Sequence, residues 1–246
     1  MTVETFTQDH ILRYGGKMKV QRKDTTTPLW TSHKYSIKEN LWVPSVSSLT
    51  GHIDGNTFNI AAGWAKNLIR DSGGDIDAVK NYNDKALEDG NRLHAQIEDY
   101  ILSKRYGGKE KIAEEPMFMA WYEEMKDFDF IAAESFVYHS SGYGGTIDAI
   151  GIDPEDGALV AFDWKTKKPG ENLPKTPSWP KDMAQLSAYI GALNDMDSAW
   201  LPERGIVCYV TRDGERAYQR NIDYELGLEL FESSWAMNNL VAKAKV

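Results

Sequence analysis

The chain has 246 residues, of which 41% are hydrophobic and 26% charged, and its formal net charge is −9. These proportions are typical of a folded globular protein and exclude a disordered chain. The negative net charge argues against a protein that coats nucleic acid through charge alone, but it is compatible with an enzyme that holds metal ions with carboxylates. The length predicts one large domain with extensions.

The single cysteine, Cys208, restricts the chemistry of the chain. One thiol cannot form an intrachain disulfide, a four-cysteine iron–sulfur cluster or a cysteine zinc site, and this favours a reducing compartment. The first twenty residues include Glu4 and Asp9 and lack the apolar core of a secretory signal, and no apolar run approaches the roughly 20 residues that span a bilayer. We therefore expect a cytoplasmic protein, in the host-cell cytoplasm if it is viral, with no membrane partner.

The N-terminal half predicts helices after an irregular beginning. Residues 1–43 mix glycines, threonines and scattered basic and aromatic residues without a sustained period, so we expect an irregular arm. Residues 44–49 predict a turn in which a serine caps a short helix. Apolar residues at helical spacing then predict three more helices, over 59–71, 82–103 and 114–125.

From residue 128 the pattern becomes that of an α/β core. Strand-forming residues predict a three-stranded antiparallel meander over 130–138, 145–152 and 159–166. A proline-rich loop, a crossover helix, a hairpin and a last helix follow, over 169–180, 182–193, 206–222 and 224–242. The expected fold is α/β, with a central mixed sheet flanked by helices. We expect one domain over 44–246, made of a helical part (44–127), an α/β core (128–222) and a C-terminal helix (223–246).

The strand over 159–166 carries an unusual pair of charges. Side chains alternate along a strand, so Asp163 and Lys165 project to one face while Phe162 and Trp164 project to the other. Buried charges are costly unless they bind something, and a divalent cation with a phosphate would satisfy both. Alone, such a pair is more often a surface ion pair.

Two further carboxylates are expected near this pair. An antiparallel hairpin brings Asp148 into the neighbourhood of Asp163, and Glu134 lies on the preceding predicted strand. Facing carboxylates repel each other, and hard cations such as Mg²⁺ and Mn²⁺ prefer oxygen ligands. The sequence therefore predicts a site for one or two such ions.

In the order of its motifs the chain resembles the PD-(D/E)XK nucleases, and within them the RecB-like exonucleases, which include phage exonucleases and a mitochondrial genome maintenance exonuclease. The resemblance rests on five segments between residue 44 and about residue 211: Pro44-Ser45-Val46-Ser47-Ser48-Leu49, Gly90-Asn91-Arg92-Leu93-His94, Gly145-Thr146-Ile147-Asp148, Asp163-Trp164-Lys165-Thr166 and Gln185-Leu186-Ser187-Ala188-Tyr189. Ile147 stands where the family's nominal motif has proline.

The resemblance implies a restriction-endonuclease-like core and roles for particular residues. Asp148 and Asp163 would bind the metal together with the backbone carbonyl of Trp164, and Lys165 would orient the attacking water. Glu134 is a candidate third oxygen donor. His94 is a candidate metal ligand, although a lone helical histidine is more often structural.

Other residues are candidates for contact with DNA. Gln185 and Tyr189 lie four apart on one helix face, and they would orient the catalytic lysine or touch the DNA backbone; helix packing is an equally good explanation. Arg92 is a weaker candidate for a phosphate contact, as is Arg212. Trp179, in the proline-rich loop beside Lys175 and Lys181, is a candidate for stacking on an unpaired base.

We therefore expect a Mg²⁺- or Mn²⁺-dependent deoxyribonuclease without an iron–sulfur cluster. By resemblance it would degrade single-stranded or duplex DNA from an end, in recombination, repair or DNA processing. The same fold also serves endonucleases, which is the first alternative. A catalytically silent nucleic-acid-binding module is the second.

Overall fold

The computed structural model describes residues 22–26, 31–38, 41–53, 57–107, 109–170, 178–196 and 201–244. Its centre is a five-stranded sheet in the order β4 (Asp129–His139), β5 (Tyr143–Ile152), β6 (Leu159–Lys167), β7 (Arg204–Thr211) and β8 (Ala217–Asn221). Neighbouring strands are antiparallel except β6 and β7, which are parallel and joined through α6 (Pro180–Met196). The predicted α/β fold with a mixed sheet is confirmed.

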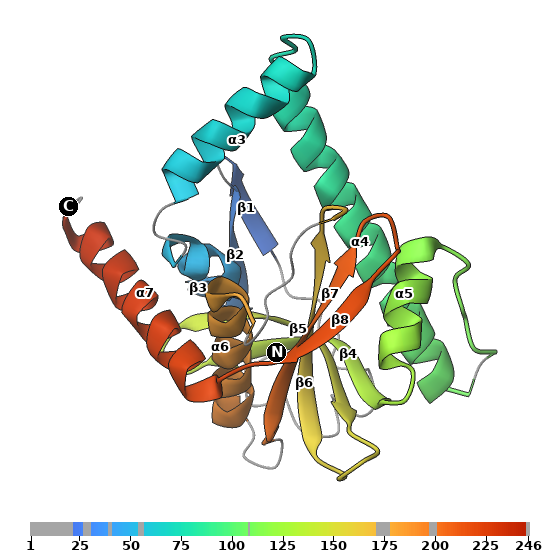
Figure 1. Cartoon of the computed structure of the whole chain (residues 1–246). Helices are drawn as coiled ribbons and strands as arrows, with labels where there is room; N and C mark the ends of the chain where they lie inside the picture. Colours follow the sequence, from blue (N-terminus) through green and yellow to red (C-terminus); the bar gives the residue numbers. More distant parts are fainter. Residues whose placement is uncertain are drawn as a thin grey trace.

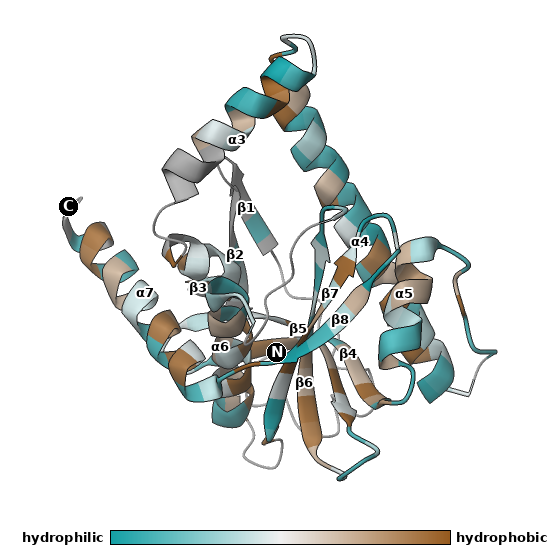
Figure 2. Ribbon diagram, viewed as in Figure 1, coloured by the Kyte–Doolittle hydropathy of each residue, from teal (hydrophilic) through white to brown (hydrophobic). Residues whose placement is uncertain are grey.

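Helices cover both faces of this sheet (Figure 1). One face carries α4 (Ala78–Arg105) and α5 (Pro116–Met125), and its core includes Trp121, Phe162 and Trp164. The other face carries α6 and α7 (Tyr224–Ala244), and its core includes Ile147 and Phe231. Hydrophobic residues are concentrated in the strands, whereas much of α4 is hydrophilic (Figure 2). Burial of these two apolar faces holds the layers together.

The prediction of an irregular arm over residues 1–43 is wrong for the part of that segment that the structure describes. Three short strands, β1 (Arg22–Thr26), β2 (Thr31–Lys38) and β3 (Leu41–Pro44), form a separate antiparallel sheet. The register between β2 and β3 shifts between Ser36 and Lys38, so the pairing is irregular near the end of β2. Long-range contact supports the sheet, because Tyr35 packs edge-on against Phe136 of β4 at 5.4 Å between ring centroids.

Two helices connect this sheet to α4. Ser45 caps α2 (Val46–Leu49) by accepting a hydrogen bond from the backbone N–H of Ser48, as the sequence predicts. A 3₁₀ turn (Thr50–His52) and α3 (Thr57–Asp71) follow. Helix α3 meets α4 at the end of the molecule farthest from the five-stranded sheet (Figure 1). Gly74, with φ of 95°, ends α3 by donating its N–H to the Ile69 carbonyl.

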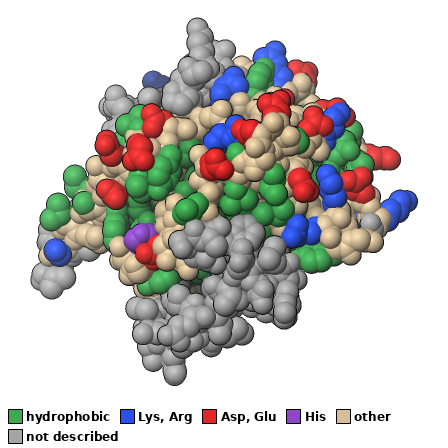
Figure 3. Space-filling model, turned by 90° about the horizontal axis from the view of Figure 1, so that it is seen from below, with side chains coloured by type: hydrophobic (Ala, Val, Ile, Leu, Met, Phe, Trp, Pro, Cys, Tyr) green, Lys and Arg blue, Asp and Glu red, His purple; other side chains and the backbone are tan. Residues whose placement is uncertain are grey.

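The surface reflects the mixed composition of the chain. On the face seen in Figure 3, acidic side chains are spread among the basic ones. In the described residues, no helix is both long and apolar enough to cross a bilayer. The predicted proline-rich loop, including Lys175, lies largely outside the described residues.

Candidate active site

Asp163 and Lys165 lie on the α6 side of β6. Phe162 and Trp164 pack into the core on the opposite side, in agreement with the two-residue alternation. Asp163 is 1% exposed, and the ammonium nitrogen of Lys165 lies 2.5 Å from its Oδ2. A carboxylate this deeply buried is tolerated because a cation lies against it.

Asp148 lies where the β5–β6 ladder stops. The last paired residues on this side are Ala149 and Phe162, and beyond them Oδ2 of Asp148 accepts a 2.6 Å hydrogen bond from the backbone N–H of Trp164. The side chain thus replaces a strand–strand hydrogen bond, and its orientation is fixed by the backbone of the strand that carries Asp163 and Lys165.

Glu134 adopts a backbone conformation that non-glycine residues rarely take. Its φ is 47°, and it lies between two residues of β4, Ala133 and Ser135, that pair regularly with β5. A left-handed residue costs about 1–2 kcal/mol, and such strain concentrates at functional sites. The irregularity occurs where β4 passes Asp148, and it brings the Glu134 carboxylate to within 3.7 Å of His94.

His94 reaches the sheet from α4 and connects these groups. Its Nε2 lies 3.1 Å from the carbonyl oxygen of Trp164, and its Nδ1 lies 3.6 Å from Oδ1 of Asp148. Burial lowers the pKa of His94, but the carboxylates of Asp148 and Glu134 outweigh it and raise the pKa to about 9. In this arrangement the imidazolium supplies positive charge to a carboxylate cluster.

The two buried aspartates show why a metal ion fits here. Burial raises the pKa of Asp163 to about 7 and also raises the pKa of Asp148, so ionising both carboxylates is unfavourable without more positive charge. Ligand atoms of His94, Glu134 and Asp148 lie within 4.8 Å of one another. Oδ2 of Asp163 is buried and faces the Lys165 ammonium at 2.5 Å. Clustered oxygens of this kind suit a hard divalent cation.

Gln185 and Tyr189 approach the site from α6. The Gln185 side-chain amide donates to Oδ1 of Asp163 at 3.4 Å and to the Tyr189 hydroxyl at 3.1 Å. Gly145 of β5 leaves room for the Tyr189 ring, because a Cβ there would lie 2.3 Å from the ring. The Gly145 and Gln185 motifs therefore meet at Tyr189, which sequence spacing alone could not establish.

Arg92 and Trp179 lie outside this constellation. The Arg92 guanidinium is bound by Glu115 at 2.8 Å and by Asp89 at 2.9 Å, so a phosphate contact by Arg92 stays a prediction and would compete with two carboxylates. Trp179 precedes α6 and is 39% exposed.

Asp182 is a charged residue near the site that the sequence analysis missed. It is buried in the first turn of α6, one of its oxygens lies 3.6 Å from the Lys167 ammonium, and its charge contributes to the raised pKa of Asp163. A signal was available, because Asp182 lies three residues before Gln185 and so projects from the same face of the helix.

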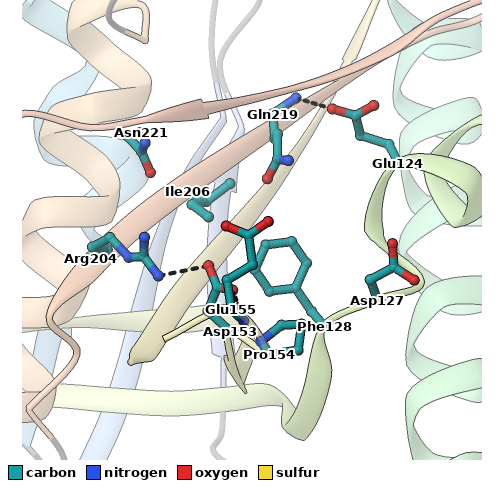
Figure 4. Close-up of a pocket in the computed structure, with 10 residues that line it drawn as sticks. All are labelled: Glu124, Asp127, Phe128, Asp153, Pro154, Glu155, Arg204, Ile206, Gln219 and Asn221. Carbon is teal, nitrogen blue, oxygen red and sulfur yellow. Dashed lines mark hydrogen bonds and ion pairs between the residues drawn. The ribbon is translucent and has the colours of Figure 1, made fainter. Parts of the chain in front are cut away.

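Two of the cavities in the described part of the chain contain charged residues that bear on the site. One, of about 500 Å³, is bordered by α4 from Ala86 to Glu98 and by Glu134, Trp164, Lys165 and Thr166. The other, of about 350 Å³, lies near the turn after β5 (Figure 4). There Arg204 points toward Asp153 and binds it at 2.7 Å, so the charge is used to hold the turn to β7. Of these two cavities, the first adjoins the carboxylate cluster.

Comparison with known proteins identifies a relative by sequence. The chain is 27% identical over 180 residues to the mitochondrial genome maintenance exonuclease 1 of Xenopus tropicalis, and the match covers 71% of this chain and 49% of that protein. The chain thus spans about half the length of its relative. No family model matches. A crystal structure of SSO0001 overlaps 78% of this chain and 75% of its own at 17% identity, with a TM-score of 0.36, which is too low to indicate a shared fold. By sequence, the chain is a distant homologue of a protein named as an exonuclease.

Proposed function

We propose that this protein is a metal-dependent exonuclease that hydrolyses phosphodiester bonds from DNA ends, of the RecB-like branch of the PD-(D/E)XK nucleases. The proposal rests mainly on the contacts among Asp148, Asp163 and Lys165. Asp148 accepts a hydrogen bond from the backbone N–H of Trp164, which lies between Asp163 and Lys165 on β6, and Lys165 contacts Asp163. His94 and Glu134 lie beside Asp148. The 27% identity to an exonuclease supports the same reaction class. Recombination, repair or DNA processing in the cytoplasm would be its setting.

The carboxylates of Asp148, Asp163 and Glu134, with the carbonyl of Trp164, would hold Mg²⁺ or Mn²⁺. A bound ion of this kind supplies activation of water and shielding of phosphate charge. His94 has two options, because its Nε2 faces the Trp164 carbonyl while its Nδ1 faces the carboxylates. It would either join the ligands after losing a proton or hold the Trp164 carbonyl in place.

Lys165 acts as a hydrogen-bond donor in this mechanism. Burial lowers its pKa, but the neighbouring carboxylates of Asp163, Asp182 and Asp148 raise the pKa above its usual value. Without a metal ion the ammonium is therefore protonated at neutral pH, which suits a hydrogen-bond donor. It orients the attacking water and offsets negative charge that builds up on the phosphate oxygens.

Gln185 positions Asp163 through its side-chain amide, and Tyr189 limits the movement of Gln185. A carboxylate whose rotamer is fixed before substrate binds loses little entropy in the reaction. We therefore assign both residues to orientation of the site.

The experiment that tests the proposed function compares linear and closed circular DNA, single-stranded and duplex. An exonuclease releases nucleotides from linear DNA with Mg²⁺ or Mn²⁺, leaves circles intact and is inactive with a chelator. Cutting of circles would support the endonuclease alternative instead. Binding without cleavage under every metal condition would support the silent binding module.

A further inference from the structure

A compact group of cations and aromatic rings lies beside the candidate active site, at the carboxyl ends of β6 and β7. The Lys167 ammonium lies 5.5 Å from the ring centroid of Trp179 and 5.0 Å from that of Tyr209. We call Lys167, Trp179 and Tyr209 the aromatic platform. Arg212 adjoins it, because its backbone N–H donates to the Lys167 carbonyl at 2.9 Å.

The platform is close to the reacting groups. Lys167 is two residues after Lys165 and projects from the same side of β6, which places the two Cα atoms about 6.6 Å apart in an extended strand. Asp182 interacts with both lysines, since one of its oxygens lies 3.6 Å from the Lys167 ammonium and its charge raises the pKa of Lys165. A strand with its phosphate at Lys165 would therefore have its neighbouring nucleotide at the platform.

Trp179 is held in place although it is exposed. Its backbone N–H donates to the Tyr209 hydroxyl at 3.1 Å, its ring lies on the Lys167 ammonium, and 39% of its surface remains accessible. A large exposed aromatic side chain is unfavourable in water, but a fixed one offers a stacking surface at little entropic cost. Tyr209, by contrast, is fully buried and serves as the support.

Arg212 extends the charged surface toward α4. Its guanidinium stacks on the Tyr82 ring at 4.6 Å and hydrogen-bonds the Tyr82 hydroxyl. Positive groups interleaved with aromatic rings are the pattern by which proteins bind single-stranded nucleic acid, with cations for phosphates and rings for bases. This pattern is local, since the chain as a whole carries a net charge of −9.

We propose that the aromatic platform is a subsite for an unpaired nucleotide next to the scissile phosphate, with the base stacked on Trp179 and the adjoining phosphate near Lys167. The inference rests on the proposed nuclease function. It adds the requirement that the DNA strand is unpaired where it leaves the site, because a base stacked between its neighbours inside a duplex has no free face to offer Trp179.

The test separates base stacking from phosphate binding. Fluorescence anisotropy would measure binding of a labelled oligothymidylate and of an abasic oligonucleotide of equal length, in EDTA so that metal-dependent cleavage does not occur. Trp179→Ala should weaken oligothymidylate binding about tenfold or more and leave binding of the abasic strand nearly unchanged. Trp179→Phe should restore most of the affinity, whereas Trp179→Leu, which keeps apolar bulk without a ring, should not.

Trp42→Ala is the matched control, since Trp42 is 38% exposed and lies on the separate three-stranded sheet. Oligothymidylate affinity within twofold of the native protein for Trp179→Ala, or an equal loss for both strands, would overturn the proposal. A lower melting temperature without a change in affinity would also overturn it, because the ring would then serve only to pack Lys167. Cleavage by the unaltered protein, measured separately with Mg²⁺, tests the nuclease proposal independently.

Discussion

Replacing Gly145 with alanine tests how closely β5 and α6 are fitted around the site. A Cβ at this position would lie 2.3 Å from Cε1 of Tyr189 and 3.0 Å from Cζ, about 1 Å short of an ordinary contact for the nearer atom. The Tyr189 ring is 5% exposed and its hydroxyl is bound to Gln185, so it has little room to move. Overpacking of this kind costs about 1–3 kcal/mol. We expect Gly145→Ala to lower the free energy of unfolding by that amount.

A double-mutant cycle identifies the cause. Tyr189→Leu removes the ring that the new methyl group meets, so Gly145→Ala should cost little in that background, with a coupling of about 1–3 kcal/mol. Urea denaturation of the four proteins measures it. Gly191→Ala is the control, because a Cβ there meets its nearest neighbour at 3.6 Å, and it should be neutral or stabilising by up to about 1 kcal/mol. Additive effects of the two substitutions would show that the new methyl group does not clash with the Tyr189 ring.

Two further predictions concern the same site. Gly90→Ala should raise the melting temperature, because its Cβ would meet Thr166 at an ordinary contact of 3.6 Å and alanine favours a helix interior by about 1 kcal/mol. It should also slow cleavage, because the methyl group enters the cavity beside His94. A lower melting temperature would contradict this prediction. In EDTA the protein should lose stability as the pH rises. Folding raises the pKa of Asp163 from 3.8 to about 7 and that of His94 from 6.5 to about 9, so the native state binds more protons than the unfolded state across pH 4–9. Mn²⁺ should reduce this loss by replacing the protons, and melting curves between pH 5 and 9 with and without Mn²⁺ would show it; a metal-free protein that becomes more stable toward pH 9 would oppose the assignment.

Much of the core could be predicted because the spacing of apolar residues along a strand or helix indicates which of its sides is buried. Phe162 and Trp164 had to face one way and Asp163 and Lys165 the other, and the structure places them so. The antiparallel meander likewise followed from a tight turn between two strand-forming runs.

What the sequence could not predict depends on register and tertiary contact. The hydrogen bond from the Trp164 backbone to Asp148 arises where the ladder ends, and no local pattern marks that point. The left-handed backbone of Glu134 is imposed by the surrounding strands. The three-stranded sheet before residue 45 was missed because its support comes from Phe136, far along the chain.

The most direct test of the proposed active site is the rate at which Asp163→Asn releases nucleotides from linear DNA in Mg²⁺ or Mn²⁺. Asp153→Asn is its control, because Asp153 is also a buried aspartate bound to a cation, but it lies at the other cavity. We predict a loss of at least about a thousandfold for Asp163→Asn, the order of effect expected when charge stabilisation at the reacting phosphate is removed, with a folded protein and near-native activity for Asp153→Asn. Metal-dependent cleavage by Asp163→Asn at the native rate would contradict the assignment of this site.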